Sequence, residues 1–206
     1  MALSGCPVLA IEGTHASGKT TLIYGLAAHY RAAGVNVAIT GEPARVSPFM
    51  EQVVLHGVGD FDLDAEVDLF GAQLTAQLRA ARHHSLLIAD KTICNVIAYA
   101  RLVLDQTDPA TCGVLDAMAT FAAAWAPLAY DLVFHVSDQY GEQQPGDDFR
   151  AKVTGLQDAT AKAVRDECTA AGLRLVEVPP NLSVGNRVTF VTTHLTGHGG
   201  VFASLP

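Results

Sequence analysis

Two glycines, a lysine and a threonine near the start of the sequence have the order and spacing of a known motif. Gly13, Gly18, Lys19 and Thr20 fit the pattern G-x-x-x-x-G-K-S/T. In such a loop, successive backbone N–H groups surround a β-phosphate, the lysine reaches the β- and γ-phosphate oxygens, and the hydroxyl ligates Mg²⁺. An apolar run precedes the loop and a helical pattern follows it, which is the context that this motif requires. We therefore predict a nucleotide-phosphate site formed by Gly13, Thr14, His15, Ala16, Ser17, Gly18, Lys19, Thr20 and Thr21.

Charged residues also follow other apolar runs of the chain. The run VNVAIT ends at Glu42 within GEPAR, SLLIAD ends at Asp90 with Lys91 directly after it, and YDLVFHVS ends at Asp138. Ligands of parallel α/β sheets bind beyond the carboxyl ends of the strands. We therefore expect these side chains to gather beside the glycine loop.

Predicted strands and helices alternate along the chain and would position these residues. Short apolar runs predict strands over 7–13, 35–40, 85–90, 130–138 and 173–181, and helical spacing predicts helices over 18–34, 61–84, 92–104, 108–127, 149–171 and 183–195. This alternation predicts an α/β fold with a five-stranded parallel sheet and right-handed crossovers. We predict one domain over residues 1–196 and a loose tail over 197–206.

Composition limits the classes of protein that the chain can represent. With 206 residues, 50% of them hydrophobic and 17% charged, the chain suits one globular domain with a sizeable core. The net charge of −8 argues against a broad nucleic-acid surface. The apolar runs look too short and interrupted to span a membrane, and the N-terminus lacks the basic region of a signal peptide. Because the four cysteines lack metal-site spacing, we expect reduced thiols and a cytoplasmic location.

In order and position, these motifs resemble the thymidylate kinase-like and nicotinamide-riboside-kinase-like families of P-loop proteins, with their AAA-type relatives. Those families carry D-R after the third strand, where this chain has Asp90 and Lys91. They often continue with x-x-x-D-x-x-A-Y, where this chain has Asn95 in the acidic position and Tyr99 at the end. The GEPAR stretch also matches their second-strand motif. The resemblance covers most of the chain and implies a three-layer P-loop kinase fold with a short lid over about 139–150.

The resemblance also implies roles for residues outside the glycine loop. In the related kinases, the helix that carries Phe70, Gln73 and Gln77 lines the acceptor pocket, although an aromatic residue at this spacing is also common in a core. The lid implies a cation at Arg150, and a solvated helix start is the alternative. The loop after the fifth strand, at Asn181, implies backbone contacts to adenine.

The strand-end residues have roles in the same scheme. Asp90 could hold Mg²⁺ together with Thr20 or accept the proton of an acceptor hydroxyl, and it could also cap a helix. Glu42 could bind a sugar hydroxyl or act as the base, and Arg45 could bind an acceptor phosphate. A surface ion pair is the alternative for these two. Lys91 replaces an arginine and lacks its two-pronged geometry.

The sequence therefore predicts an ATP- and Mg²⁺-dependent phosphotransferase acting on a small molecule, a nucleoside or a nucleotide. The alternative is a nucleotide-binding switch, an ATPase or GTPase without an acceptor, which Lys91, Asn95 and the arginine-poor lid region favour. We expect no nucleic-acid or membrane partner. The acceptor, the choice of ATP over GTP and a homodimer remain open.

Overall fold

One parallel sheet forms the centre of the protein. The computed structural model describes residues 5–14, 16–45, 47–50, 62–138, 157–198 and 202. The strands are ordered β2-β3-β1-β4-β5, and each pairs in parallel with its neighbours. Their bounds are β1 Val8–Glu12, β2 Val37–Thr40, β3 Leu86–Asp90, β4 Leu132–Val136 and β5 Leu175–Val178. The predicted five-stranded α/β sheet is confirmed.

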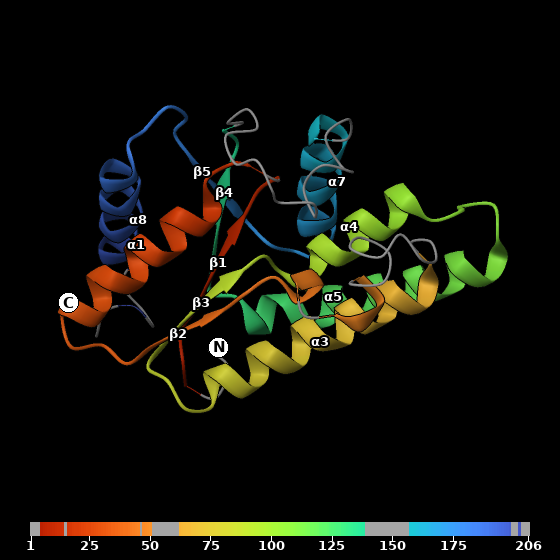
Figure 1. The fold of residues 1–206 in the computed structure, drawn as a ribbon, viewed down its shortest axis with the longest axis horizontal. Helices are drawn as coiled ribbons and strands as arrows, with labels where there is room; N and C mark the ends of the chain where they lie inside the picture. Colours follow the sequence, from red (N-terminus) through yellow and green to blue (C-terminus); the bar gives the residue numbers. More distant parts are fainter. Residues whose placement is uncertain are drawn as a thin grey trace.

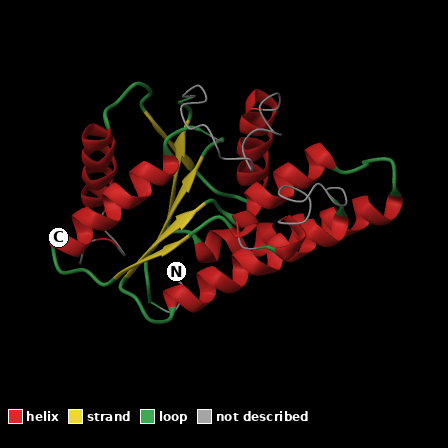
Figure 2. Cartoon of the chain, in the orientation of Figure 1, coloured by secondary structure: helices red, strands yellow, loops and turns green. Residues whose placement is uncertain are grey.

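Helices cover both faces of the sheet and make a three-layer fold (Figures 1 and 2). Helices α1 and α8 cover one face, and α3, α4, α5 and α7 cover the other. Their bounds are α1 Lys19–Ala32, α3 Leu63–Ala81, α4 Ile93–Val103, α5 Pro109–Ala129, α7 Gln157–Ala170 and α8 Val184–His198, with a 3₁₀ turn, η1, at Pro43–Arg45. The described helices agree with the predicted P-loop kinase architecture.

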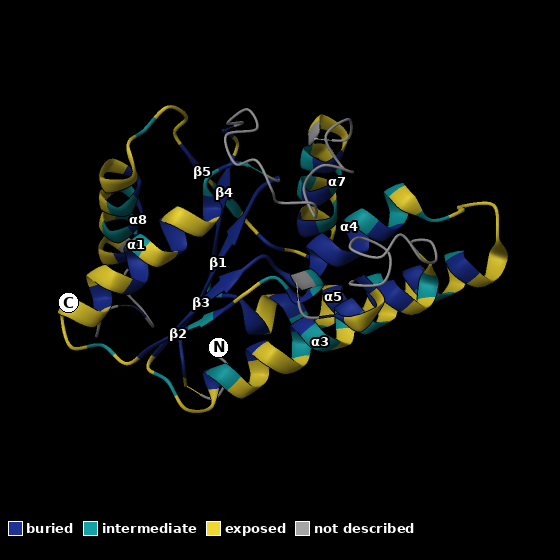
Figure 3. Ribbon diagram, viewed as in Figure 1, coloured by how far each residue is buried: buried dark blue, intermediate teal, exposed yellow. Residues whose placement is uncertain are grey.

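The central strands β1, β3 and β4 are mostly apolar because each contacts helices on both sides. In β1, Val8 and Ala10 belong to the core under α3–α5 and α7, whereas Leu9 and Ile11 belong to the core under α1 and α8. All four side chains are fully buried, and Figure 3 shows the central sheet in the colour of buried residues. Buried parallel strands therefore read as continuous apolar runs, and the charged residue that ends each run marks the edge of the sheet.

Two helix starts have the caps that their sequences suggest. The Asp62 carboxylate caps α3 by accepting a hydrogen bond from the backbone N–H of Ala65 at 2.9 Å. The Asp108 carboxylate caps α5, with Pro109 at the first helical position. These caps fix where α3 and α5 begin relative to the sheet.

The later part of the chain differs from the predicted bounds in two places. Helix α8 continues to His198, beyond the predicted domain end at 196, and Phe202 is buried in the core under α1 and α8. The predicted lid at 139–150, with Arg150, lies outside the described residues, as does the start of the helix predicted over 149–171.

Helix α5 is long and apolar enough to be a candidate for crossing a membrane, with a mean hydropathy of 1.4 over 18 residues. The sequence-based expectation that no run reaches this length therefore does not hold for α5. Its Leu115, Ala122 and Ala126 side chains are buried in the core under the sheet. Only 28% of that 18-residue stretch is buried, and a single helix of this length and composition is weak evidence for a membrane span.

Gly13 is tightly enclosed where β1 ends. Its φ is +143°, and a Cβ atom built there would lie 2.4 Å from the Val136 carbonyl oxygen of β4. We expect Gly13→Ala to lower the free energy of unfolding by about 1–3 kcal/mol, because backbone must move to admit a methyl group. Chemical denaturation measures the difference.

The matched control is Gly71→Ala on the exposed side of α3, where a Cβ would meet no atom within 4 Å. There alanine should raise the free energy of unfolding by about 0.5–1 kcal/mol, because it favours the helix. A Gly13→Ala protein as stable as the wild type would contradict the close approach of β1 and β4.

Candidate functional site

The glycine loop between β1 and α1 wraps around its own lysine. Gly18 caps α1, and Lys19 is the first residue of that helix. The Lys19 Nζ donates to the Thr14 carbonyl oxygen at 2.5 Å and to Ser17 Oγ at 3.4 Å. The Ser17 hydroxyl donates to the same carbonyl at 2.9 Å, whereas Thr20 is exposed. The glycine loop thus has the position of a phosphate-binding loop, at the N-terminus of a helix.

Burial changes the acidity of this lysine. Lys19 is only 7% exposed, and burial lowers its pKa to about 8. The nearby charge of Lys91 acts in the same direction, while the carboxylates of Asp90 and Glu42 oppose it. An anion that entered the loop would stabilise the charged ammonium.

Glu12, the last residue of β1, is a site residue that the sequence analysis did not single out. Its side chain is fully buried. Its Oε1 accepts hydrogen bonds from the Thr92 backbone N–H at 2.6 Å and the Thr92 hydroxyl at 2.7 Å, and its Oε2 accepts one from Asn95 Nδ2 at 2.8 Å. Glu12 thereby fastens the start of α4 to the strand that leads into the glycine loop.

This contact gives a physical reason for Asn95. The related families often have an acidic residue at this position, but here the side chain must donate to a buried carboxylate. An asparagine amide can donate and an ionised aspartate cannot. Asn95, in place of the acidic residue of the related families, is therefore explained by its hydrogen bond to Glu12.

The turn between β3 and α4 is held by two glutamines of α3. Lys91 has a φ of +73°, in the left-handed region. Its carbonyl oxygen accepts hydrogen bonds from Gln73 Nε2 at 2.9 Å and Gln77 Nε2 at 3.1 Å, and Gln73 also donates to the Asp90 carbonyl at 3.2 Å. Both buried amides thus donate to main-chain carbonyls. Direct contact of Gln73 or Gln77 with an acceptor therefore remains a prediction.

Lys91 forms a buried ion pair with Glu42 across the end of the sheet. Its Nζ lies 2.5 Å from Glu42 Oε1 and 5.1 Å from the centre of the Tyr99 ring. Burial alone would lower the pKa of Lys91, but Glu42, Tyr99 and Asp90 together outweigh it and the pKa is raised. Lys91 therefore stays charged at neutral pH.

Asp90 lies at the same edge with one oxygen left over. Its side chain is buried, and its Oδ1 has no hydrogen-bond partner among the residues that the structure describes. Burial raises the pKa of this carboxyl group, while the charges of Lys19 and Lys91 act against the increase. Because Lys19 and Lys91 affect the pKa of Asp90, these residues lie close together. This agrees with the prediction that the strand-end residues gather beside the glycine loop.

The remaining predicted residues are placed less completely. Phe70 is half-buried on α3 and packs edge-to-face on Phe121 of α5, with ring centres 5.8 Å apart. Arg45 ends η1, but its side chain lies outside the described residues, as do His15 and Arg150. The roles predicted for these residues stay predictions.

Arg187 of α8 is a second residue that the sequence analysis missed. It is 2% exposed, and its Nη1 donates to the Ser17 carbonyl of the glycine loop at 3.1 Å. Its Nη2 lies 2.9 Å from Asp138 Oδ2, and its Nε donates to the Leu182 carbonyl at 3.1 Å. Asn181 has a φ of +62° and donates its backbone N–H to Asp138 Oδ1 at 2.7 Å. One guanidinium group thus joins the glycine loop, the end of β4 and the loop after β5.

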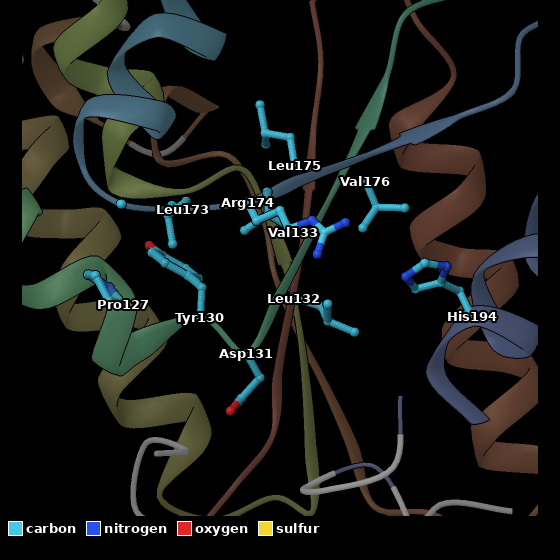
Figure 4. Close-up of a pocket in the computed structure, with 11 residues that line it drawn as sticks. Pro127, Tyr130, Asp131, Leu132, Val133, Leu173, Arg174, Leu175, Val176 and His194 are labelled. Atoms are coloured by element: carbon cyan, nitrogen blue, oxygen red, sulfur yellow. The ribbon is translucent and has the colours of Figure 1, made fainter. Parts of the chain in front are cut away.

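Two cavities lie at opposite edges of the sheet. One of about 270 Å³ borders the glycine loop and is lined by residues that include Thr14, Ser137 and Arg165. The other, of about 360 Å³, lies where β4 and β5 begin, with Tyr130, Leu173 and His194 in its lining (Figure 4). Because the strands are parallel, the second cavity is at the edge away from the glycine loop.

Comparisons with known proteins agree with this geometry. Residues 8–187 match the family model described as "AAA domain". No curated protein matches the sequence. The structure of a NadR protein in complex with NR is similar with a TM-score of 0.67 and 18% identity, over 95% of this chain and 51% of that one. This chain therefore spans about half the length of that NadR chain.

Two further structures match over nearly the whole length of both chains. Deoxyadenosine kinase from M. mycoides with bound dATP has a TM-score of 0.59 and 17% identity, over 92% of this chain and 99% of that one. Thymidylate kinase from Candida albicans has a TM-score of 0.69 and 16% identity, over 94% of this chain and 92% of that one. At these identities the likeness shows the fold, and it confirms the predicted resemblance to P-loop kinases.

The contact between Glu12 and Asn95 predicts a pH-dependent loss of stability in Asn95→Asp. Two carboxyl groups would then share one buried site, which raises the pKa of the pair in the folded state above its value in the unfolded chain. The folded variant binds the extra proton more tightly, so its stability is retained at low pH and lost as the pH rises. We expect the melting temperature of the variant to fall further below that of the wild type between pH 5 and pH 8.

Asn186→Asp makes the same chemical change at an exposed position of α8, and its difference from the wild type should vary little over this pH range. An Asn95→Asp protein that follows the pH profile of Asn186→Asp would show that Glu12 does not depend on the amide of Asn95.

Proposed function

We propose that this chain, which belongs to the AAA domain family, is an ATP- and Mg²⁺-dependent phosphotransferase acting on a small molecule, a nucleoside or a nucleotide. The observation that carries the proposal is the buried ion pair of Lys91 and Glu42 beside Asp90 and the glycine loop. A protein that only bound or hydrolysed its nucleotide would not need this second charged centre, whereas an acceptor must be bound and deprotonated next to the transferring phosphate.

The residues present fit Mg²⁺. The exposed Thr20 hydroxyl follows the lysine of the loop, and Asp90 Oδ1 is a buried carboxylate oxygen without a hydrogen-bond partner among the described residues. Hydroxyl and carboxylate oxygens together with phosphates are the usual ligands of Mg²⁺. When bound, the ion would neutralise charge on the β- and γ-phosphate oxygens.

The other groups have separate tasks in the proposed reaction. Lys19 and the loop N–H groups stabilise charge on the transferring phosphoryl group. Glu42 is the candidate base that receives the proton of the acceptor hydroxyl, and Asp90 is the alternative base if it does not hold the ion. Lys91 offers a fixed positive charge beside the acceptor. Most of the rate acceleration in such a transfer comes from position and charge.

A panel of acceptors tests the proposal. ATP turnover with Mg²⁺ is measured alone and with individual nucleosides and nucleotides, and phosphorylated products are identified by mass. Turnover stimulated by one acceptor, with its phosphorylated product, is the expected result. Lys19→Ala should remove the transfer while leaving the fold intact. Turnover that stays flat across the panel would overturn the proposal and favour the alternative of a nucleotide-binding switch.

The lowered pKa of Lys19 predicts that nucleotide binding depends on pH. Only the protonated ammonium attracts phosphate, and with a pKa of about 8 its population falls as the pH rises. We expect the affinity for ATP to weaken about tenfold between pH 7 and pH 9, with proton uptake on binding. Calorimetry in buffers with different ionisation enthalpies measures both.

Lys162 supplies the control for this measurement. It is an exposed lysine of α7 paired with Asp166, so Lys162→Gln should keep the full pH dependence. An affinity that is constant from pH 7 to pH 9 in the wild type would contradict the titration of Lys19.

A further inference from the structure

Helix α3 extends beyond the end of the sheet where the charged residues gather. Its C-terminal end lies at the start of β2, because Asn36 Nδ2 donates to the His83 carbonyl at 3.0 Å. Farther back along the helix, Gln73 reaches the Asp90 carbonyl where β3 ends. Residues of α3 before Gln73 therefore lie past the carboxyl edge of the sheet, where Figure 1 shows the helix beside α4 and α5.

Glu66 is on the inner side of this extension. It precedes Gln73 by seven residues and Gln77 by eleven, so the three side chains share one face of the helix. Two helical turns place Glu66 about 10 Å along the axis from Gln73. Glu66 thus overhangs the region beside Asp90, Lys91 and Glu42.

The side chain of Glu66 is buried, and one of its carboxyl oxygens has no hydrogen-bond partner among the described residues. The residue is 3% exposed, and its Oε2 makes no hydrogen bond within the part of the chain that the structure describes. Burial, opposed by the charge of Lys91, raises the pKa of Glu66 to about 7. The Lys91 ammonium is bonded to Glu42 instead. A buried carboxyl group in this state is costly, so a ligand that donates to it gains a strong interaction.

We propose that Glu66 determines specificity in the acceptor site by accepting a hydrogen bond from the exocyclic amino group of the acceptor base. The inference rests on the proposed function, because it takes the region beside Asp90 and Lys91 as the place of the acceptor. It adds the chemical class of the acceptor: a nucleoside or nucleotide whose base carries an exocyclic amino group.

The position of Glu66 favours the base over the reacting end of the acceptor. Lys19, Asp90 and Glu42 surround the reacting end, and Glu66 lies two turns of α3 away from the strand end that they share. Phe70, one turn from Glu66 on the same helix, is half-buried and packs edge-to-face on Phe121. An acceptor without the donor would leave the carboxyl group unpaired, and a site of this kind discriminates strongly.

Matched acceptors test the assignment. For wild type and Glu66→Gln, kcat/KM is measured with pairs that differ in an amino group and an oxo group, cytidine against uridine and adenosine against inosine, and with their monophosphates. In the wild type we expect a preference for the amino member of at least one pair. In Glu66→Gln this preference should fall about tenfold, because a neutral amide replaces a charged acceptor of the hydrogen bond. Glu66→Leu should remove it.

The controls separate specificity from folding. Asp64→Asn changes an exposed acid on the opposite side of the same helix and should keep the wild-type preference. The melting temperature of Glu66→Gln should equal or exceed that of the wild type, since a neutral amide costs less to bury than a carboxylate. If Glu66→Gln lowers kcat/KM equally for both members of every pair, or leaves the preference unchanged, the assignment is overturned.

Equilibrium binding of the same pairs, with an unhydrolysable ATP analogue present, distinguishes this proposal from the proposed function. If the amino member binds more tightly but is not phosphorylated, and Glu66→Gln removes this preference, the role of Glu66 is supported and the kinase activity is contradicted. Phosphorylation without any preference contradicts Glu66 and supports the kinase. A wild type that neither binds nor phosphorylates any acceptor overturns both.

Discussion

The structure depends on burying several ionisable side chains at one edge of a parallel sheet. An ion removed from water costs free energy unless partners replace its hydration. Glu12 has three donors, and Lys91 has the Glu42 carboxylate. Asp90 and Glu66 each keep a buried oxygen without a hydrogen-bond partner among the described residues. The paired groups hold the site rigidly. These two oxygens of Asp90 and Glu66 mark where a bound metal or ligand would interact most favourably.

Local patterns in the sequence were sufficient for the fold. The strands of this sheet are short, mostly apolar runs that end at or near a glycine, a proline or a charged residue, so β1 to β5 could be predicted from short windows of sequence. The same reasoning predicted that Glu42 and Asp90 lie at one edge, because parallel strands bring their carboxyl ends together. The glycine loop was predicted for a similar reason, since its residues are consecutive and their spacing is set by the phosphate that they surround.

Contacts between distant residues were beyond such reasoning. The helical face of Gln73 and Gln77 was predicted, but their partner is the carbonyl of a residue in the left-handed region, which no local pattern announces. The contact of Glu12 with Asn95 spans 83 positions, and without it the asparagine looks like a lost catalytic acid. For Arg187 the sequence contains one weak indication of burial. It lies on the same face of α8 as the buried Val191 and Leu195.

The bond from Arg187 to the Ser17 carbonyl has a consequence for how the protein is made. The two residues are 170 positions apart, so the glycine loop emerges from the ribosome long before the arginine that braces it. The same guanidinium also holds Asp138 and the loop after β5. During synthesis the loop can take its local shape early, but its outer support arrives only with the last helix. Nucleotide present in the cell would then meet a finished cradle only on chains that have been translated through α8.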